Sequence, residues 1–403
     1  MEMECTRELT DDIYWVGGSD RRLGLFENIH PVPDGVSYNS YLISDDKTCL
    51  MDTCDWAVGQ GFLENLEAAL NGRKLDVLVV DHMEPDHAAT LNEVVVRYPD
   101  VEIYCTMMAS RMYKQYGYKG LDNLHTVAEG DTLSLGKHEL TFYLAPMVHS
   151  PEVMVSFDSY SGALFSADAF GTFGALNGAL FADEMEIDDE WFAEARRYYG
   201  NICGKYGMQV QNLLKKAKEL EGLKMICPLH GPVWRKDLDK FIARYDKWSR
   251  YEPEEKGVLI VYASMYGHTE NCAEVLASEL IQSGVTDVKM CDVSGTAVSY
   301  LISDVFKYSN IALFSVTYNM GVFPKMKDFI HDMQALNLQN RTISILENGT
   351  WAPQSKDLMA SMLEEMQDMR VMEEKMTIMS SASDDDRETI CRMAEEIKDS
   401  LGE

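Results

Sequence analysis

Three features are missing from this 403-residue chain, and each absence narrows the classes of protein to which it can belong. None of the nine cysteines stands in a Cys-x-x-Cys pair, which argues against a rubredoxin-type iron centre or a ferredoxin-type cluster. Their odd number and wide spacing predict reduced, buried thiols in a reducing compartment. No apolar run approaches the roughly 20 residues that cross a bilayer. The acidic start, Met1–Cys5, does not resemble a signal peptide, so we expect a soluble, cytoplasmic protein.

Basic residues are also scarce, because 36 Lys and Arg stand against 66 Asp and Glu, a formal net charge of −30. Such an excess repels phosphate backbones and anionic headgroups, so neither nucleic acid nor membrane is an expected partner. It favours a locally basic docking partner instead. The remaining composition, 46% apolar and 25% charged, is ordinary for a globular protein that is long enough for two domains.

The densest chemistry lies directly after the apolar run Asp76–Val80, which predicts a short buried strand, and before residues 88–96, which predict a helix. Four groups that can bind a metal lie on the turn between them, where ligands can be held while one side stays open. Alternatively, Asp86 is only a helix N-cap and His82 a surface histidine, but four such coincidences in six residues are improbable. The four groups are His82, Glu84, Asp86 and His87.

Before residue 250 the pattern mixes strands and helices, which is typical of two packed sheets flanked by helices. The expected strands are Ile13–Gly17, Asn39–Ile43, Thr48–Asp52, Val101–Cys105, Glu139–Leu144, Val153–Phe157, Ala163–Ser166 and Lys224–Pro228. The expected helices are Gly61–Gly72, Met107–Tyr116 and a stretch over roughly Asp189–Leu220. The charged, proline-containing stretch Asp246–Lys256 is the expected linker.

Beyond the linker, strands and helices alternate regularly, which predicts a doubly wound parallel sheet of the flavodoxin type. The two predicted domains are therefore residues 1–250 and 257–403. The expected strands are Val258–Ala263, Val288–Asp292, Ile311–Val316, Thr342–Leu346 and Lys375–Met379. The expected helices are Thr269–Ser283, Val298–Val305, Pro324–Ala335, Ser355–Gln367 and Asp385–Leu401.

Three loops at the carboxyl ends of these strands predict a second binding site. The first loop offers hydroxyl groups, a glycine and the free N–H groups of a helix N-terminus, which can hold a phosphate dianion, and it lacks the Gly-Lys-Ser/Thr of a P-loop. Tyr318 and Trp351, on the other two loops, could cover a planar ring. Ordinary turns with core aromatics are the alternative. The candidate residues are Ser264, Met265, Tyr266, Gly267, His268 and Thr269, then Thr317, Tyr318, Asn319, Met320 and Gly321, then Asn348, Gly349, Thr350, Trp351 and Ala352.

Over almost its whole length the chain resembles the flavodiiron protein family, on the motif His-x-Glu-x-Asp-His with a later histidine, aspartate and histidine. The resemblance implies an N-terminal metallo-β-lactamase-like αβ/βα sandwich, a flavodoxin-like domain with FMN, and two iron ions. Some members of the family replace the histidine at His87 by water. Other histidines, such as His125, His138 and His331, are expected at the surface or in the core. The implied ligands are His82, Glu84 and His149 for one iron, Asp86, His87 and His230 for the other, and Asp168 between them.

Glu84 carries information about the metal. Zinc hydrolases of the related fold have a histidine at this place, whereas a second hard oxygen ligand favours iron in a mixed nitrogen and oxygen site. A zinc-dependent hydrolase fused to a flavodoxin domain is nevertheless one alternative function. An electron carrier whose N-terminal domain is only structural is another.

The family resemblance also implies an activity, the reduction of O2 to water or of NO to N2O. Two ferrous ions and a two-electron-reduced flavin hold the four electrons that O2 requires. Because no further module follows Glu403, the chain resembles the minimal class of an anaerobe, supplied by rubredoxin, a flavoprotein reductase or F420H2. A head-to-tail homodimer, or a dimer of dimers, is expected to bring the FMN of one chain to the irons of another. Either Tyr198 or Tyr199 is expected to line the substrate pocket.

Overall fold

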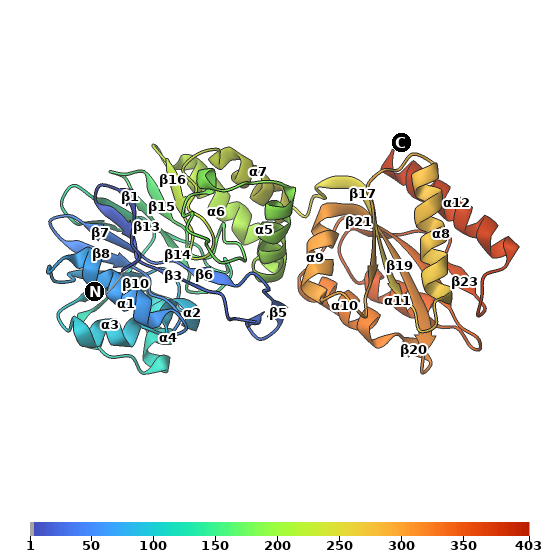
Figure 1. The fold of residues 1–403 in the computed structure, drawn as a ribbon, viewed down its shortest axis with the longest axis horizontal. Coiled ribbons are helices and arrows are strands. Elements are labelled where there is room, and N and C mark those ends of the chain that lie inside the picture. Colours follow the sequence, from blue (N-terminus) through green and yellow to red (C-terminus); the bar gives the residue numbers. More distant parts are fainter. Residues whose placement is uncertain (1–3, 403) are drawn as a thin grey trace. The chain divides into compact units, whose positions relative to one another are not determined.

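The computed structural model describes residues 4–402, which form two compact units (Figure 1). The first unit contains the residues up to Tyr199 together with Met208–Asp246, and the second contains Gly200–Gly207 together with the residues from Lys247 onward. Residues 1–3, with which the acidic start begins, and residue 403, the end of the second predicted domain, lie outside the described residues. Within residues 4–402, no helix is long and apolar enough to cross a bilayer.

The strands of the first unit form two main sheets and two short pairs. Their bounds are β1 Arg7–Thr10, β2 Ile13–Trp15, β3 Gly18–Asp20, β4 Leu25–Phe26, β5 His30–Pro31, β6 Val36–Tyr38, β7 Tyr41–Ser44, β8 Thr48–Met51, β9 Val77–Val80, β10 Glu102–Thr106, β11 Leu124–Val127, β12 Thr132–Ser134, β13 Glu139–Leu144, β14 Met154–Asp158, β15 Ala163–Phe165 and β16 Met225–Cys227. The first sheet has the order β1-β2-β7-β8-β9-β10-β11, the second has the order β12-β13-β14-β15-β16, and β3-β6 and β4-β5 pair separately.

The core of this unit lies between the two sheets. Successive side chains of a strand point to opposite faces, so every second residue can face the other sheet. Ile43, Met51 and Val79 of the first sheet pack in one cluster with Phe142 and Phe165 of the second, and all five are at most 2% exposed. Each such burial stabilises the unit by roughly 1.5–3 kcal/mol.

Helices flank both sheets of the first unit, so the predicted αβ/βα sandwich is confirmed. Figure 1 shows the earlier helices beside the first sheet and the later ones beside the second. The helices are α1 Gly59–Leu70, α2 Pro85–Ala88, α3 Leu91–Arg97, α4 Met107–Tyr116, α5 Asp189–Ile202, α6 Gly207–Glu219 and α7 Leu238–Ser249.

The stretch Asp189–Leu220 is helical, as expected, but it is divided into α5 and α6 by a short 3-10 helix over Gly204–Tyr206. A Cβ at Gly207 would lie 2.4 Å from the Ser249 carbonyl oxygen, so the chain needs a glycine at this approach. The linker is also shorter than Asp246–Lys256, since α7 continues to Ser249 and the next strand begins at Glu255. The spacing of Phe241, Tyr245 and Trp248, all fully buried, explains why α7 extends so far.

The second unit is a doubly wound sheet, as predicted. Its strands are β17 Glu255–Ala263, β18 Val288–Asp292, β19 Tyr308–Tyr318, β20 Gly321–Val322, β21 Arg341–Asn348, β22 Met369–Val371 and β23 Met376–Ile378. Its helices are α8 His268–Gln282, α9 Val298–Lys307, α10 Pro324–Ala335, α11 Ser355–Glu364 and α12 Asp384–Leu401. The strand order is β18-β17-β19-β21-β22, with β23 also on β21, and all these pairs are parallel. Such a sheet binds ligands beyond the carboxyl ends of its strands.

A buried histidine ties the two sheets of the first unit together. His138 is fully buried between β12 and β13, its Nδ1 lies 2.8 Å from Asp158 Oδ2, and its Nε2 lies 3.1 Å from Asp12 Oδ2. Burial by itself lowers the pKa of His138, but the hydrogen bonds with Asp158 and Asp12 outweigh it and raise the pKa. Since Asp12 belongs to the turn between β1 and β2, the imidazole links the first sheet to the second.

The substitution His138→Gln is expected to lower the free energy of unfolding by about 3 kcal/mol at pH 6, because it leaves the fully buried carboxylate of Asp158 without its histidine partner. A histidine with a raised pKa stabilises fully below its unfolded pKa of about 6.5 and loses this effect as pH rises through the folded value. The loss should therefore be smaller at pH 9. Urea unfolding at both pH values measures it. His125→Gln, at an exposed histidine, is the control, and equal losses of the His138 variant at both pH values would contradict the assignment.

Candidate functional site

The metal motif begins at the end of β9, but the segment after it is not the expected single helix. Pro85 opens the short helix α2, whose N-cap is Glu84, so Asp86 is not an N-cap. Helix α3 then starts at Leu91. The break is held by Thr90, whose hydroxyl donates to the Cys54 carbonyl oxygen at 2.6 Å and accepts from the Cys54 N–H at 3.1 Å. The motif therefore forms a tight turn that includes α2, and its polar side chains point to one side.

The other three predicted ligands come from the second sheet. His149 lies in the loop between β13 and β14, Asp168 follows β15, and His230 follows β16. The structure brings all seven predicted ligands together in two groups. The group around Glu84, called group A, contains His82, Glu84, His149 and Asp168. The group around Asp86, called group B, contains Asp86, His87 and His230.

In group A, all ligand atoms face one point. The distance from His149 Nε2 is 3.3 Å to Glu84 Oε2 and 3.1 Å to Asp168 Oδ2. His82 Nε2 lies 3.5 Å from both of these oxygens. Atoms that are each about 2.1 Å from one metal ion are separated by roughly 3.0–3.5 Å, so these spacings fit a shared ion.

Group B has the same spacing and shares Asp168 with group A. His87 Nε2 lies 3.0 Å from His230 Nε2, and each of the two nitrogens lies 3.3 Å from Asp86 Oδ2. Asp168 turns its other oxygen, Oδ1, to this side, 3.1 Å from His87 Nε2 and 3.7 Å from His230 Nε2. His87, at the position where some family members have water, thus points its Nε2 into the group.

Three ligand atoms in these groups make no hydrogen bond to any part of the chain that the structure describes, namely His82 Nε2, Asp86 Oδ2 and Asp168 Oδ1. Buried polar atoms are rarely left without a partner, because the lost interaction with water costs free energy. The three ligand atoms without a hydrogen-bond partner lie around two points, and metal ions bound at these points would satisfy them. The mixture of imidazoles and carboxylates suits iron.

The electrostatics of the groups favour added positive charge. Burial by itself lowers the pKa of His149, but Asp168 and Glu84 raise it to about 10. The pKa of His82 is likewise raised well above its ordinary value, against the effect of burial, by the charge of Asp168. Protons respond here to the same surplus of carboxylate charge that attracts cations. Metal ions can replace these protons.

Two contacts behind the ligands were not anticipated. Glu152, only 1% exposed, places Oε1 2.8 Å from His82 Nδ1, and the Ser37 carbonyl oxygen lies 2.7 Å from His230 Nδ1. Glu152 stands three residues after the predicted ligand His149, a spacing that could have marked it in the sequence. No sequence signal marks Ser37, because it is the fold that brings its carbonyl to the histidine.

Aromatic rings line one side of group B. The ring of Tyr198 lies 5.6 Å from that of His230, the ring of Phe26 5.4 Å from it, and the ring of Tyr38 5.6 Å from it. Tyr199 instead packs against Tyr245 at 5.0 Å. Tyr198 is therefore the better candidate for the tyrosine that lines the substrate pocket.

The three predicted loops of the second unit surround one cavity of about 580 Å³. All the candidate residues line it except Gly267, Gly321 and Ala352, and Val316 and Ser380 line it as well. Gly267 instead shapes the loop with a φ of 90°, as the N-cap of α8. Thr317 contributes mostly to structure, since its hydroxyl accepts from the Gln354 N–H at 2.9 Å.

The cavity of the second unit fits FMN. The hydroxyl of Thr269 is buried at the first turn of α8 and has no hydrogen-bond partner in residues 4–402. A helix N-terminus with a free hydroxyl binds a phosphate group well. Tyr266 and Trp351, 87% and 69% exposed, stand beside the cavity, where rings of this kind can stack on an isoalloxazine.

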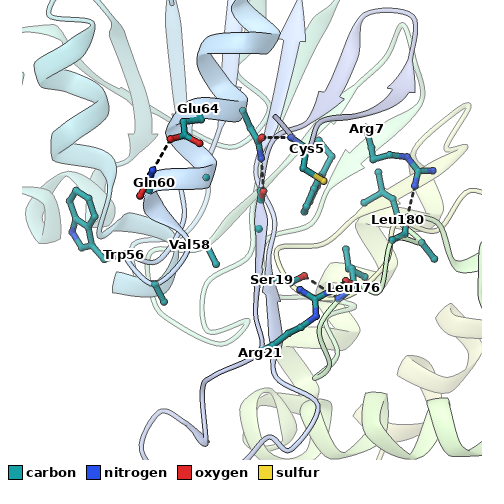
Figure 2. A pocket seen from close by; sticks show the side chains of 18 residues that line it. Cys5, Arg7, Ser19, Arg21, Trp56, Val58, Gln60, Glu64, Leu176 and Leu180 are labelled. Atoms are coloured by element: carbon teal, nitrogen blue, oxygen red, sulfur yellow. Dashed lines mark hydrogen bonds between the residues drawn. The ribbon is translucent and has the colours of Figure 1, made fainter. Parts of the chain in front are cut away.

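A separate cavity of about 590 Å³ in the first unit contains none of the predicted ligands (Figure 2). Glu64 and Gln60 of α1 line one wall and are bonded to each other at 2.8 Å. Arg7 is paired with Glu184 at 2.8 Å, and Arg21 donates to the Leu176 carbonyl oxygen. These four side chains are thus engaged within the chain, and the cavity contains no cluster of metal-binding groups like groups A and B among the described residues.

Comparisons with known proteins agree with both halves. The family described as ODP family beta lactamase matches residues 36–231, and the family described as Flavodoxin matches residues 260–372. The anaerobic nitric oxide reductase flavorubredoxin of Pectobacterium atrosepticum is 32% identical over 86% of this chain and 68% of its own. The rubredoxin oxygen:oxidoreductase of Desulfovibrio gigas superposes with a TM-score of 0.92 at 27% identity, over 99% of both chains. The flavodiiron protein of Giardia intestinalis, at 23% identity and a TM-score of 0.93 over 100% of this chain and 98% of its own, shares the fold.

Proposed function

Because the chain belongs to the flavodiiron protein family, we propose that it is an oxidoreductase that reduces nitric oxide to N2O at two iron ions, with electrons passed through FMN. The observation that carries the proposal is the position of Asp168, which turns one carboxylate oxygen toward each group of ligands. The relative named anaerobic nitric oxide reductase favours NO as the substrate.

Reduction of O2 to water is the second candidate reaction. The similarity to the rubredoxin oxygen:oxidoreductase of Desulfovibrio gigas supports it, and both substrates would use the same ligands. Reduction of two NO molecules to N2O and water takes two electrons and two protons, whereas reduction of O2 to two waters takes four of each. The two reactions therefore differ in the number of electrons that the donor must supply.

The chain's own residues divide the work between two places. When bound, the iron ions and FMN supply the electrons of the reduction. Asp168 would contribute to both metal positions, since one of its carboxylate oxygens faces each group. The rings of Phe26, Tyr38 and Tyr198 make an apolar side toward group B, which suits a neutral diatomic molecule and limits the entry of water.

We assign the metal chemistry to residues 1–250 and the binding of FMN to residues 257–403. Ser264 and Thr269 would hold the phosphate, and Trp351 would cover the ring. Trp56 and Ile29 of the first unit are exposed apolar residues, as are Tyr266 and Trp351 of the second. A head-to-tail homodimer, or a dimer of dimers, would cover such residues and bring FMN to the irons of another chain.

The donor is proposed to be a separate protein such as rubredoxin, or a reductase or F420H2. The name of the Desulfovibrio gigas relative supports rubredoxin. The net charge of −30 favours a donor with a basic docking face. We expect the protein to act in the cytoplasm, apart from nucleic acid and membrane.

The test is a steady-state comparison of NO and O2 consumption by protein of measured iron and FMN content, with an artificial reductant. We expect NO consumption with N2O as the product. Rapid O2 consumption and slow NO consumption would favour the second candidate. Zinc in place of iron, with no turnover of either gas, would instead support the hydrolase alternative, and FMN reduction without gas consumption would support the electron carrier.

A further inference from the structure

The two groups of metal ligands differ in what stands behind their histidines. A histidine that binds a metal through Nε2 must carry its proton on Nδ1, and the partner of that N–H controls the orientation and basicity of the ring. Group A and group B supply different partners. These partners hydrogen-bond to the Nδ1 side of each histidine, away from the metal positions.

In group A, a buried carboxylate stands behind His82. Glu152 Oε1 lies 2.8 Å from His82 Nδ1 and also accepts from the Met83 N–H at 3.0 Å. The Glu152 backbone is held in turn, because its carbonyl oxygen accepts from the Thr106 hydroxyl at 2.9 Å. With Glu152 on Nδ1, the lone pair of Nε2 is left free to face Glu84 and Asp168.

In group B, neither histidine is hydrogen-bonded through Nδ1 to a carboxylate of residues 4–402. His230 Nδ1 meets a neutral acceptor, the carbonyl oxygen of Ser37, at 2.7 Å. His87 Nδ1 is buried and has no hydrogen-bond partner within residues 4–402. Binding of a metal to His87 Nε2 therefore puts a proton on a buried nitrogen that cannot share it, which weakens this ligand.

The side chains of group A are also more exposed to solvent than those of group B. The side chains of Glu84 and His149 in group A are 33% and 13% exposed. In group B, the side chains of His87 and His230 are fully buried and that of Asp86 is 17% exposed, about half as much as Glu84. An ion from solvent therefore reaches the ligands of group A more directly, through Glu84.

From this asymmetry, and resting on the proposed diiron function, we propose that the two metal positions are unequal and that group A binds its metal first and more tightly. Glu152 is the positioning residue that makes the difference, since it orients His82 and adds a negative charge behind it. Group B completes the pair afterwards, with Asp168 already held by the first ion.

The order can be measured by titrating metal-free, FMN-containing protein with Co2+ under anaerobic conditions, following the visible absorption and the bound metal by equilibrium dialysis. We expect two steps, the first at least about 10-fold tighter than the second. Glu84→Ala should remove the tight step, whereas His230→Ala should keep it and remove the weak one. Two steps of equal affinity, or a tight step that is lost in His230→Ala and kept in Glu84→Ala, would overturn the order.

The role of Glu152 is tested in the same titration by Glu152→Gln, which keeps the shape of the side chain and removes its charge. The first step should weaken by about 10- to 100-fold and its absorption band should shift, while the second step stays within about 3-fold. Asp158→Asn is the matched control, because it removes an equally buried carboxylate from behind His138, which is not a proposed ligand. It should leave both steps unchanged.

An unaltered first step in Glu152→Gln, or equal weakening of both steps in the two variants, would refute the role of Glu152. The wild-type titration and the Glu84→Ala and His230→Ala pair test the order even if Glu152→Gln does not fold. A wild-type protein that binds neither Fe2+ nor Co2+ would refute the diiron function itself. Binding of both ions in equal steps would refute only this inference.

Discussion

Replacing Asp168 with asparagine is expected to reduce NO consumption by more than about 100-fold, the upper end of the cost of losing a partner behind a ligand. Bound iron should fall from about two ions to at most about one per chain, because an amide cannot offer an anionic oxygen to both metal positions. Asp168 is 2% exposed and turns Oδ2 to His149 and Oδ1 to His87, so no water can easily take its place. Bound FMN should be unchanged, since its proposed residues lie in the other unit.

The experiment measures iron, FMN and NO turnover on the same preparations of the wild type, Asp168→Asn and the control Asp158→Asn. The control removes a carboxylate that is also buried and also bonded to a histidine, but away from groups A and B. Retention of both irons and of turnover in Asp168→Asn would contradict the shared position of Asp168. Equal loss of iron in the control would point to a general effect on the fold.

The second large effect is expected in the flavodoxin-like unit, at a buried arginine. Arg341 is 2% exposed and donates to carbonyl oxygens alone, among them those of Val305 at 2.7 Å, Tyr251 at 2.7 Å and Asn340 at 2.8 Å. No carboxylate in the described part of the chain pairs with it. Burial lowers the pKa of Arg341 to about 9, which still leaves it charged at neutral pH. One guanidinium thus joins the segment before β17, the end of α9 and the start of β21.

Arg341→Met should lower the free energy of unfolding of this unit by about 3–5 kcal/mol, because it leaves several buried carbonyl groups without a donor. Urea unfolding followed by the fluorescence of released FMN reports on this unit within the whole chain. The control is Arg370→Met on the neighbouring strand β22, an exposed position where a change within about 0.5 kcal/mol is expected. Equal midpoints for the two variants would contradict the structural role of Arg341.

Much of the fold follows from local patterns. The bounds of α4, α10, β13 and β18 agree with the sequence prediction at both ends, because each has a clear apolar period and clear breaks. The errors occur where distant parts of the chain decide the outcome. The turn after Ala88 depends on the hydrogen bonds of Thr90 to Cys54, and the extent of α7 depends on three buried aromatic residues.

For the site, the sequence by itself predicted the ligands and the class of cofactor. Four side chains that can bind a metal occur within six positions, and such a density is rare unless a metal binds there. These residues are His82, Glu84, Asp86 and His87. The loops after β17, β19 and β21 can be predicted as a binding site, because the carboxyl ends of parallel strands lie at one edge of a sheet. These are properties of residue type and order, which a sequence carries directly.

Only the tertiary structure decided how those ligands are arranged. The predicted ligands form two groups that share Asp168, and the ring of His87 points into one of them. The ring of Tyr198 lies beside that of His230, and Glu152 lies behind His82. Each of these depends on distances of a few ångströms between side chains that are far apart in the chain. Such distances result from the packing of two whole sheets, and no local pattern of residues encodes them.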